Sequence, residues 1–176
     1  RAGIFIWDLN SLKLIKHVEM NKTEPWLSSL DEKKNQLLIY YDDGSFKGLD
    51  ALTFNEQFAF PEMSSGSRMI GYTHSGGEVY SYYNNTFCVW KLEDQELHYR
   101  FIPLDTSDFI LLNNEGYYYA SQKGAKNLHY VFGKYSVISF EQLDIKYNRP
   151  DKILFSIGNT DTALIQSYKN AYQKRI

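Results

Sequence analysis

The sequence predicts an all-β fold, a partial β-propeller of four-stranded blades followed by a small helical tail. The first reason is a repeat: Ile4-Phe5-Ile6-Trp7-Asp8-Leu9 returns as Phe87-Cys88-Val89-Trp90-Lys91-Leu92, with a degenerate copy at 45–50. Aligned through Trp7, Gly48 and Trp90, the copies lie 41 and 42 residues apart. A period near 40 residues with a Trp-Asp-like strand end is typical of a propeller blade. The second reason is the aromatic content of 16%, which suits pleated, half-buried strands.

Each period divides into short β runs separated by turn residues. Asp43-Gly44, Asn84-Asn85 and Gly133-Lys134 lie between such runs, where Gly or Asn tolerates the positive φ of a tight turn. Strands are expected at 4–9 and 12–18 in a first half-blade, and at 26–30, 36–41, 45–50 and 52–58 in the second blade. They follow at 68–73, 78–83, 86–92 and 95–101, and then at 108–112, 116–121, 128–132 and 135–138. Residues 1–138 thus form about three and a half blades, too few for a closed ring.

The pattern changes after residue 138, so residues 139–176 are expected to form a helical exit segment. A short helical stretch begins at 139–142, and Pro150 suits the first turn of a second helix that Gly158 ends. Asp161 is the expected cap of a longer helix that continues to about Arg175. Its apolar residues at helical spacing are Ala163, Leu164, Tyr168, Ala171 and Tyr172. Because this helix is amphipathic, we expect it to dock on the rest of the protein.

The composition argues against several classes of function. A formal net charge of −2 leaves no basic footprint for nucleic acid. No apolar run approaches the ~18 residues of a membrane span. Cys88 is the only cysteine, which excludes an internal disulfide and favours a reducing, cytoplasmic compartment. The chain opens inside a strand pattern at Arg1, so we expect a fragment of a longer protein.

Two regions resemble known families. The strand ends Ile6-Trp7-Asp8 and Val89-Trp90-Lys91, with their 41- and 42-residue steps, resemble WD40 repeats over residues 4–138, although the Gly-His pair of those repeats is absent. The segments Glu115-Gly116-Tyr117-Tyr118-Tyr119-Ala120-Ser121, Gly124-Ala125, 139–151 and 171–176 are similar to a block in large bacterial proteins, where WD40 repeats precede a caspase-like peptidase domain. This resemblance implies the last blades and their exit segment, with the peptidase beyond Ile176. The peptidase His and Cys motifs have no match here, so no catalytic residue is carried over.

Residues with reactive side chains are interpreted as structural. Cys88 lies between Phe87 and Val89 in an expected inner strand and is interpreted as a small buried hydrophobe, since a reactive thiol needs a cationic, partly exposed setting. Four histidines, His17, His74, His98 and His129, show no metal-binding spacing. The acidic pairs Asp31-Glu32, Asp42-Asp43 and Glu93-Asp94 are interpreted as turn formers, and Lys123-Gly124 is expected to close a hairpin. No metal or cofactor is therefore expected.

The candidate interaction or coupling residues are Arg149, Asp144, Tyr117 and Tyr118. The first two belong to a dense polar cluster at 144–151. This cluster either ties the short helices to the last blade or couples propeller occupancy to a following domain, and both interpretations stay open. The run Tyr117-Tyr118-Tyr119 either fills the blade core with its hydroxyls at the surface or forms a protein-recognition patch.

We therefore predict a non-catalytic protein-interaction, scaffold or sensor module within a larger multidomain protein. The alternative is the regulatory region of a caspase-like cysteine peptidase whose catalytic domain lies beyond this chain. The expected partner is a protein: either the remaining blades of the same protein or a second copy, in a homodimer of half-propellers. Nucleic acid and membranes are not expected partners.

Overall fold

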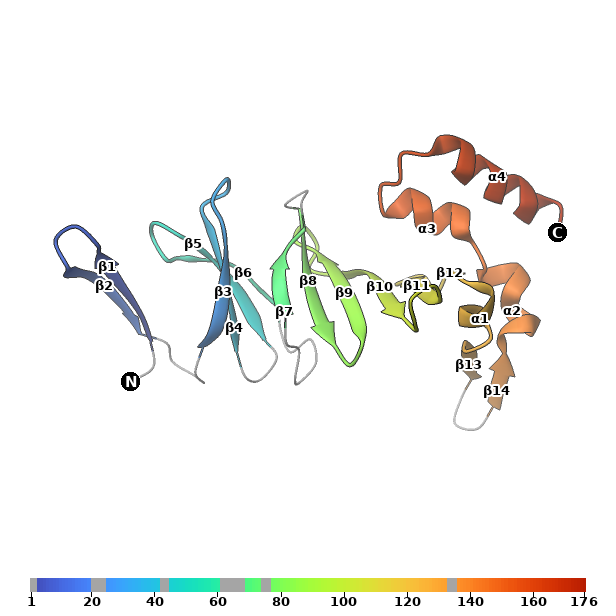
Figure 1. Cartoon of the computed structure of the whole chain (residues 1–176), viewed down its shortest axis with the longest axis horizontal. Coiled ribbons are helices and arrows are strands. Elements are labelled where there is room, and N and C mark those ends of the chain that lie inside the picture. Colours follow the sequence, from blue (N-terminus) through green and yellow to red (C-terminus); the bar gives the residue numbers. More distant parts are fainter. Residues whose placement is uncertain (1–2, 20–24, 42–44, 61–68, 74–76, 133–135) are drawn as a thin grey trace. The chain divides into compact units, whose positions relative to one another are not determined.

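The chain is mainly β-strand in antiparallel sheets, with a few short helices (Figure 1), which confirms the all-β class. The computed structural model describes residues 3–19, 25–41, 45–60, 69–73, 77–132 and 136–176. They form two compact units: residues up to Asn84 with Trp90–Glu96, and Asn85–Val89 with Leu97–Ile176. The turns expected at Asp43-Gly44 and Gly133-Lys134, the acidic pair Asp42-Asp43 and His74 lie outside the described residues.

A four-stranded antiparallel meander forms the centre of the first unit. Its strands are β3 (Pro25–Asp31), β4 (Gln36–Tyr41), β5 (Phe46–Asp50) and β6 (Glu56–Phe60), in that order. This sheet is the one expected for the second blade, except that its last strand begins at Glu56 instead of residue 52. The reason is a turn over Asp50–Asn55, in which the Asp50 carboxylate accepts the amide N–H groups of Leu52 and Thr53.

Both faces of this sheet are buried. Leu38, Phe46 and Phe60 cluster on one face with Val79 of β8 (Glu78–Tyr83). Ile39, Tyr41 and Leu49 cluster on the other face, and Ile4 of β1 (Gly3–Asp8) packs against them. Strands β4 and β5 therefore carry apolar residues on both faces of the sheet. This pattern is typical of a sheet stacked between two others.

One type of turn recurs through the first unit. It closes the β1–β2 hairpin, where β2 is Lys13–Glu19, and it also follows β3, β5 and β9 (Thr86–Lys91). In each turn the fourth residue after the strand end has positive φ: Leu12 (54°), Asn35 (49°), Phe54 (61°) and Gln95 (59°). At Asp8, Asp31 and Asp50, the carboxylate of the last strand residue accepts hydrogen bonds from the backbone N–H groups two and three residues further on. These bonds hold non-glycine residues in the left-handed region.

The recurring turn corrects the alignment of the degenerate repeat. Asp8, Asp50 and Lys91 occupy the same position before it, so Trp7 corresponds to Leu49 and Trp90, and the steps become 42 and 41 residues. Gly48 therefore does not stand in place of a tryptophan. Glycine is required at 48 for another reason, since a Cβ there would overlap the Phe58 ring on β6.

The strand grouping expected for the last blade is wrong. In the second unit β11 (Phe109–Asn113) pairs with β10 (Leu97–Pro103) on one side and with β12 (Tyr118–Ala120) on the other. β13 (His129–Phe132) and β14 (Ser136–Ser139) form a separate two-stranded sheet. The separation coincides with helix α1 (Gln122–Ala125) between β12 and β13, where a hairpin at Lys123-Gly124 was expected.

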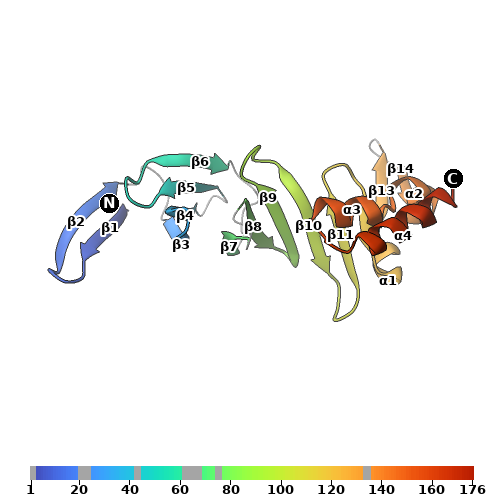
Figure 2. The same ribbon diagram turned by 90° about the horizontal axis from the view of Figure 1, so that it is seen from above.

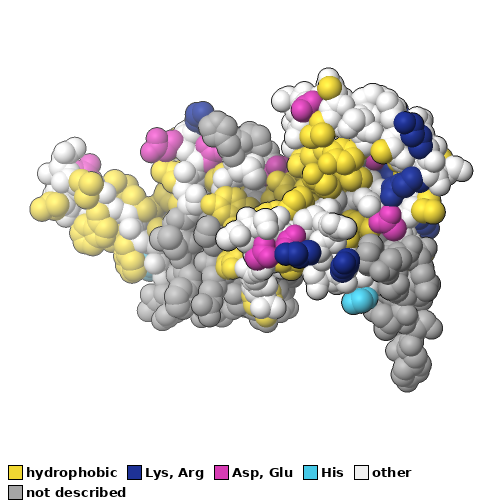
Figure 3. Space-filling model, turned by 45° about the vertical axis from the view of Figure 1, so that its right-hand side comes forward, with side chains coloured by type: hydrophobic (Ala, Val, Ile, Leu, Met, Phe, Trp, Pro, Cys, Tyr) yellow, Lys and Arg dark blue, Asp and Glu magenta, His cyan; other side chains and the backbone are white. Residues whose placement is uncertain are grey.

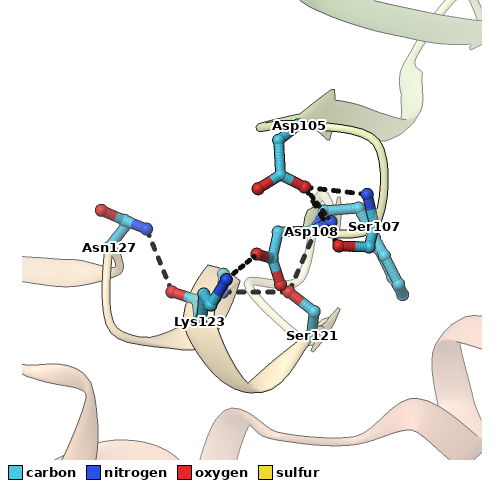
Figure 4. A network of polar contacts seen from close by, with 8 residues as sticks. Asp105, Ser107, Asp108, Ser121, Lys123 and Asn127 are labelled. Atoms are coloured by element: carbon cyan, nitrogen blue, oxygen red, sulfur yellow. Dashed lines mark hydrogen bonds and ion pairs between the residues drawn. The ribbon is translucent and has the colours of Figure 1, made fainter.

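A polar network holds α1 against the turn between β10 and β11 (Figure 4). The Ser121 hydroxyl caps the helix by accepting the Gly124 N–H at 3.0 Å, and it also accepts the Phe109 N–H at 3.3 Å. Asp105 accepts the amides of Ser107 and Asp108, and the Lys123 ammonium lies 3.4 Å from the Asp108 carboxylate. A cap that bonds strand and helix at once explains why this segment is not a hairpin.

Three helices follow β14: α2 (Phe140–Tyr147), α3 (Pro150–Ser156) and α4 (Thr162–Gln173). Pro150 opens α3, Gly158 follows it with φ of 74°, and the Asp161 carboxylate caps α4 by accepting the Leu164 N–H at 2.9 Å, as predicted. α3 and α4 lie side by side in both views (Figures 1 and 2). The domain boundary expected at 138/139 stays a prediction.

Candidate functional site

The predicted candidates Tyr117, Tyr118, Asp144 and Arg149 lie together in the second unit. With Asp151, Tyr172 and Arg175 they form a set of contacts between β12, α2, α3 and α4, which we call the exit junction. These residues come from the segments 117–118, 144–151 and 172–175. The fold thus brings together residues as far apart in the sequence as Tyr117 and Arg175, which are separated by 58 positions.

Asp144 receives hydrogen bonds from three directions. The Tyr118 hydroxyl, on a fully buried side chain of β12, donates to Oδ1, and Asn148 donates to the same oxygen at 2.8 Å. The Arg175 guanidinium donates to Oδ2 at 2.8 Å and to the Asn148 carbonyl at 3.1 Å. The carboxylate thus connects the last strand of the sheet to α2 and to the end of α4.

Arg149 forms the other half of the exit junction. Its guanidinium donates to both carboxylate oxygens of Asp151, at 2.9 and 2.7 Å, and its Cζ atom lies 3.9 Å from the ring centroid of Tyr172. The Arg149 N–H donates to the Tyr118 carbonyl at 3.0 Å. The residue before a proline favours extended backbone. Pro150 therefore keeps the Arg149 backbone extended beside β12, outside helix α3.

Electrostatics keep this pair charged. The Arg149 hydrogen bonds lower the pKa of the Asp151 carboxyl below its ordinary value of 3.8, against the opposing effect of burial. The same contact raises the pKa of Arg149. Nearby, a hydrogen bond to Tyr168, followed by burial, raises the pKa of Tyr119 to about 12, so the Tyr119 hydroxyl stays protonated at neutral pH.

The exit junction includes residues that sequence reasoning missed. Arg175 and Tyr172 were assigned to the tail helix, but their contacts with Asp144 and Arg149 were not expected. The detectable signal is the spacing of Ile165, Tyr168 and Tyr172, which are the half-buried residues of α4. Ala163, Leu164 and Ala171, which were expected on the apolar face, are exposed. Tyr118 is fully buried, so it cannot itself form part of a surface patch.

A second candidate site lies in the first unit. An open groove of about 480 Å³ lies between the β3–β4 turn and strands β7 (Met69–Tyr72) and β8. The turn provides Asp31, Glu32, Lys33 and Lys34, and the strands provide Tyr72 and Tyr80. Burial, with a smaller effect of Asp31, raises the pKa of Tyr72, so its hydroxyl is neutral. Sequence reasoning interpreted Asp31-Glu32 as turn formers but did not predict a groove beside them.

The reactive side chains show no catalytic arrangement in the part of the chain that the structure describes. Cys88 is partly buried, and burial raises the pKa of its thiol against the opposing effect of Arg100. The His17 ring stacks on Phe5 at 4.3 Å, and His98 packs edge-on to Tyr99. Across the described ranges, no three His, Cys, Asp or Glu residues are placed to hold a metal ion.

No protein-family model matches the chain, and no curated protein sequence matches it either. Among the described residues, no helix is both long enough and apolar enough to cross a membrane. The exit junction and the groove must therefore be interpreted from their own geometry.

The exit junction predicts a specific response to acid. The folded-state pKa of Asp151 is depressed, so its contribution to stability is complete above the ordinary value of 3.8 and is lost as pH falls through the lower folded value. We expect Asp151→Asn to be less stable than the parent at pH 7, with the difference shrinking as pH falls below about 4. Urea unfolding at a series of pH values measures this difference. A constant difference from pH 7 to the acid limit would contradict the assignment.

Proposed function

We propose that this chain is a non-catalytic protein-interaction module, built as part of a WD40-like β-propeller. Support comes from the first unit, where the β1–β2 hairpin and the β3–β6 sheet repeat the same turn, and where two apolar clusters pack the β3–β6 sheet against Val79 of β8 on one face and Ile4 of β1 on the other. Stacked sheets with a period of 41 and 42 residues are typical of propeller blades. Such folds present loops between blades as binding surfaces.

The observation that carries the proposal is the groove between β3–β4 and β7–β8. It is open, two of its side chains are tyrosines, and its rim carries Asp31, Glu32, Lys33 and Lys34. Tyrosine combines a large apolar ring with a hydroxyl and is enriched where proteins recognise other proteins. Mixed charges on an open rim suit an extended polypeptide of mixed charge better than an enclosed small molecule.

The wider setting is part of the same proposal. We infer that the missing blades come from a longer polypeptide or from a second copy of the chain. The exit junction then joins the last sheet to a following domain, for which a caspase-like peptidase is the candidate that the 115–176 resemblance suggests. The module would act in such a protein as a regulatory region.

A selection from a displayed peptide library against the immobilised chain tests the proposal. We expect an enriched peptide family whose binding falls about tenfold in Lys33→Glu or Glu32→Lys, since charges on a rim set complementarity. Lys126→Glu, on an exposed residue of the second unit, is the matched control and should leave binding unchanged. If no peptide is enriched, or if the control variant loses binding equally, the groove is not the peptide-binding site. Hydrolysis of the peptides would contradict the non-catalytic role.

A further inference from the structure

Two lysines of the second unit lie against tyrosine rings that are themselves neighbours. The Lys152 ammonium is 3.8 Å from the ring centroid of Tyr117, and the Lys146 ammonium is 4.8 Å from that of Tyr147. The centroids of the two rings are 6.4 Å apart. Lys146, Tyr147, Tyr117 and Lys152 therefore form one chain of contacts, which we call the lysine–tyrosine ledge.

Three short segments position the ledge. Tyr117 ends the turn before β12, where its N–H donates to the Asn113 side chain at 2.9 Å. Gly116 has φ of 82°, and the Tyr147 ring lies over it, 3.7 Å from the place that a Cβ would take. Tyr147 is the last residue of α2, and Lys152 lies in the first turn of α3. The two rings and Lys152 are half-buried, so the fold holds the ledge in place while leaving it open to a partner.

The ledge lysines differ from the arginines of the exit junction in what balances their charge. Each arginine donates to a carboxylate, at 2.7 and 2.8 Å. In the part of the chain that the structure describes, no ion pair joins Lys146 or Lys152 to a carboxylate. A ring face attracts a cation but does not neutralise it, and an ammonium has three N–H donors. The ledge thus presents two positive charges on an aromatic surface.

The surrounding charge favours an anionic partner. Residues 139–176 contain six Lys or Arg and four Asp or Glu, although the whole chain has a formal net charge of −2. Basic side chains lie on the surface of the second unit in the face that Figure 3 shows. An excess of one sign near a binding surface attracts the opposite sign and sets complementarity.

The kind of anion follows from which cations are available. Phosphate groups are recognised best by the bidentate fork of arginine, and both arginines of the exit junction already bind carboxylates. Nucleic acid binding depends on neutralising many phosphates, whereas the ledge offers two lysines. Two point charges beside apolar rings fit carboxylates that flank an apolar side chain, since tyrosine is favoured at protein interfaces.

We propose that the lysine–tyrosine ledge is a docking site for an acidic, extended segment of a different protein. Glutamate or aspartate side chains of that segment accept hydrogen bonds from the ammonium groups of Lys146 and Lys152. An apolar residue between the acidic ones packs on the rings of Tyr117 and Tyr147. The ledge belongs to the second unit, so this inference goes beyond the groove of the proposed function and does not depend on it.

The probe is a fluorescent peptide of sequence Gly-Glu-Glu-Leu-Glu-Glu-Gly, titrated with the whole 176-residue chain and followed by anisotropy. We expect saturable binding with a Kd below about 1 mM, and at least a tenfold loss when glutamine replaces every glutamate. Binding should also weaken severalfold between about 50 and 300 mM salt, because salt screens exposed charges. Absence of binding up to about 1 mM, or equal binding of the glutamine peptide, would overturn the proposal.

Variants of the chain locate the site. Lys152→Ala and Lys146→Ala should each weaken binding about fivefold, and Lys152→Arg, which keeps the charge, should retain most of it. Lys169→Ala removes the same charge from an exposed position on α4 and is the matched control, which should bind like the parent. Equal losses in Lys169→Ala would mean that overall charge, not the ledge, attracts the peptide.

Two further results separate this proposal from its competitors. If a single-stranded oligonucleotide of the same charge binds more tightly than the peptide and depends on the same lysines, the partner is a nucleic acid and the proposal is wrong. If the acidic peptide fails to bind while the groove variants still alter library binding, the ledge is not a docking site and the proposed function survives.

Discussion

Replacing Arg149 with Ala is expected to lower the free energy of unfolding of the second unit by about 3 kcal/mol, because the change removes one partner of a buried ion pair. The side chains of Arg149 and Asp151 are 14% and 6% exposed, so water cannot replace the lost bidentate contact. The variant leaves the Asp151 carboxylate buried without its cation, and it removes the guanidinium from the Tyr172 ring. Urea unfolding at pH 7 measures the loss.

A matched pair of variants identifies the cause. Lys152→Ala removes a neighbouring cation, whose described contact is with the Tyr117 ring, 3.8 Å from its centroid, and not with Asp151. We therefore expect the free energy of unfolding to fall by less than about 1 kcal/mol. Arg149→Met combined with Asp151→Leu replaces both charges by apolar groups and should recover most of the stability lost in Arg149→Ala. An unchanged unfolding midpoint in Arg149→Ala would reject the structural account and favour a role in coupling to another domain.

The exit junction also explains why some of its members could be predicted and others could not. Asp144, Arg149 and Asp151 lie within eight consecutive positions, so their polar density is visible in the sequence. The partner Tyr172 lies on α4 and Arg175 lies just after it. Their approach to Arg149 and Asp144 depends on how α4 packs on α3. No local pattern specifies that packing, although the half-buried stripe of Ile165, Tyr168 and Tyr172 marks the contacting side of α4.

Local signals predicted individual elements better than their grouping into sheets. The helix cap Asp161 and the stop Gly158 act within a few residues, and the structure confirms both. The predicted grouping of strands in the last blade was wrong because strand pairing depends on the connections between strands. The short turn at 104–108 pairs β11 with β10, and the Ser121 cap begins a helix after β12. The Gly48 alignment was wrong because the degenerate copy keeps too few of the repeat's residue types to fix its register, whereas the shared turn after Asp8, Asp50 and Lys91 does fix it.

Phe46→Ala is expected to have the largest effect in the first unit, about 4 kcal/mol of unfolding free energy. Its side chain is fully buried in the cluster with Leu38, Phe60 and Val79. The ring stacks on Phe60 with centroids 4.4 Å apart and meets Phe58 edge-on at 6.5 Å. Truncation therefore leaves a cavity between the two stacked sheets and removes aromatic contacts worth more than their area. Such a loss is a large fraction of the stability of a small domain.

Leu52→Ala is the matched control, because Leu52 lies on the exposed turn after the same strand and its truncation should change stability by less than about 0.5 kcal/mol. Hydrogen exchange resolves the effect by segment: in Phe46→Ala the amides of β3–β6 should open with a lower free energy. Because Phe46 packs between the β3–β6 sheet and Val79 of β8, the amides of β8 should be affected as well. Loss of protection in β3–β6 alone would mean that the two sheets do not depend on each other, which would remove the main support for stacked blades.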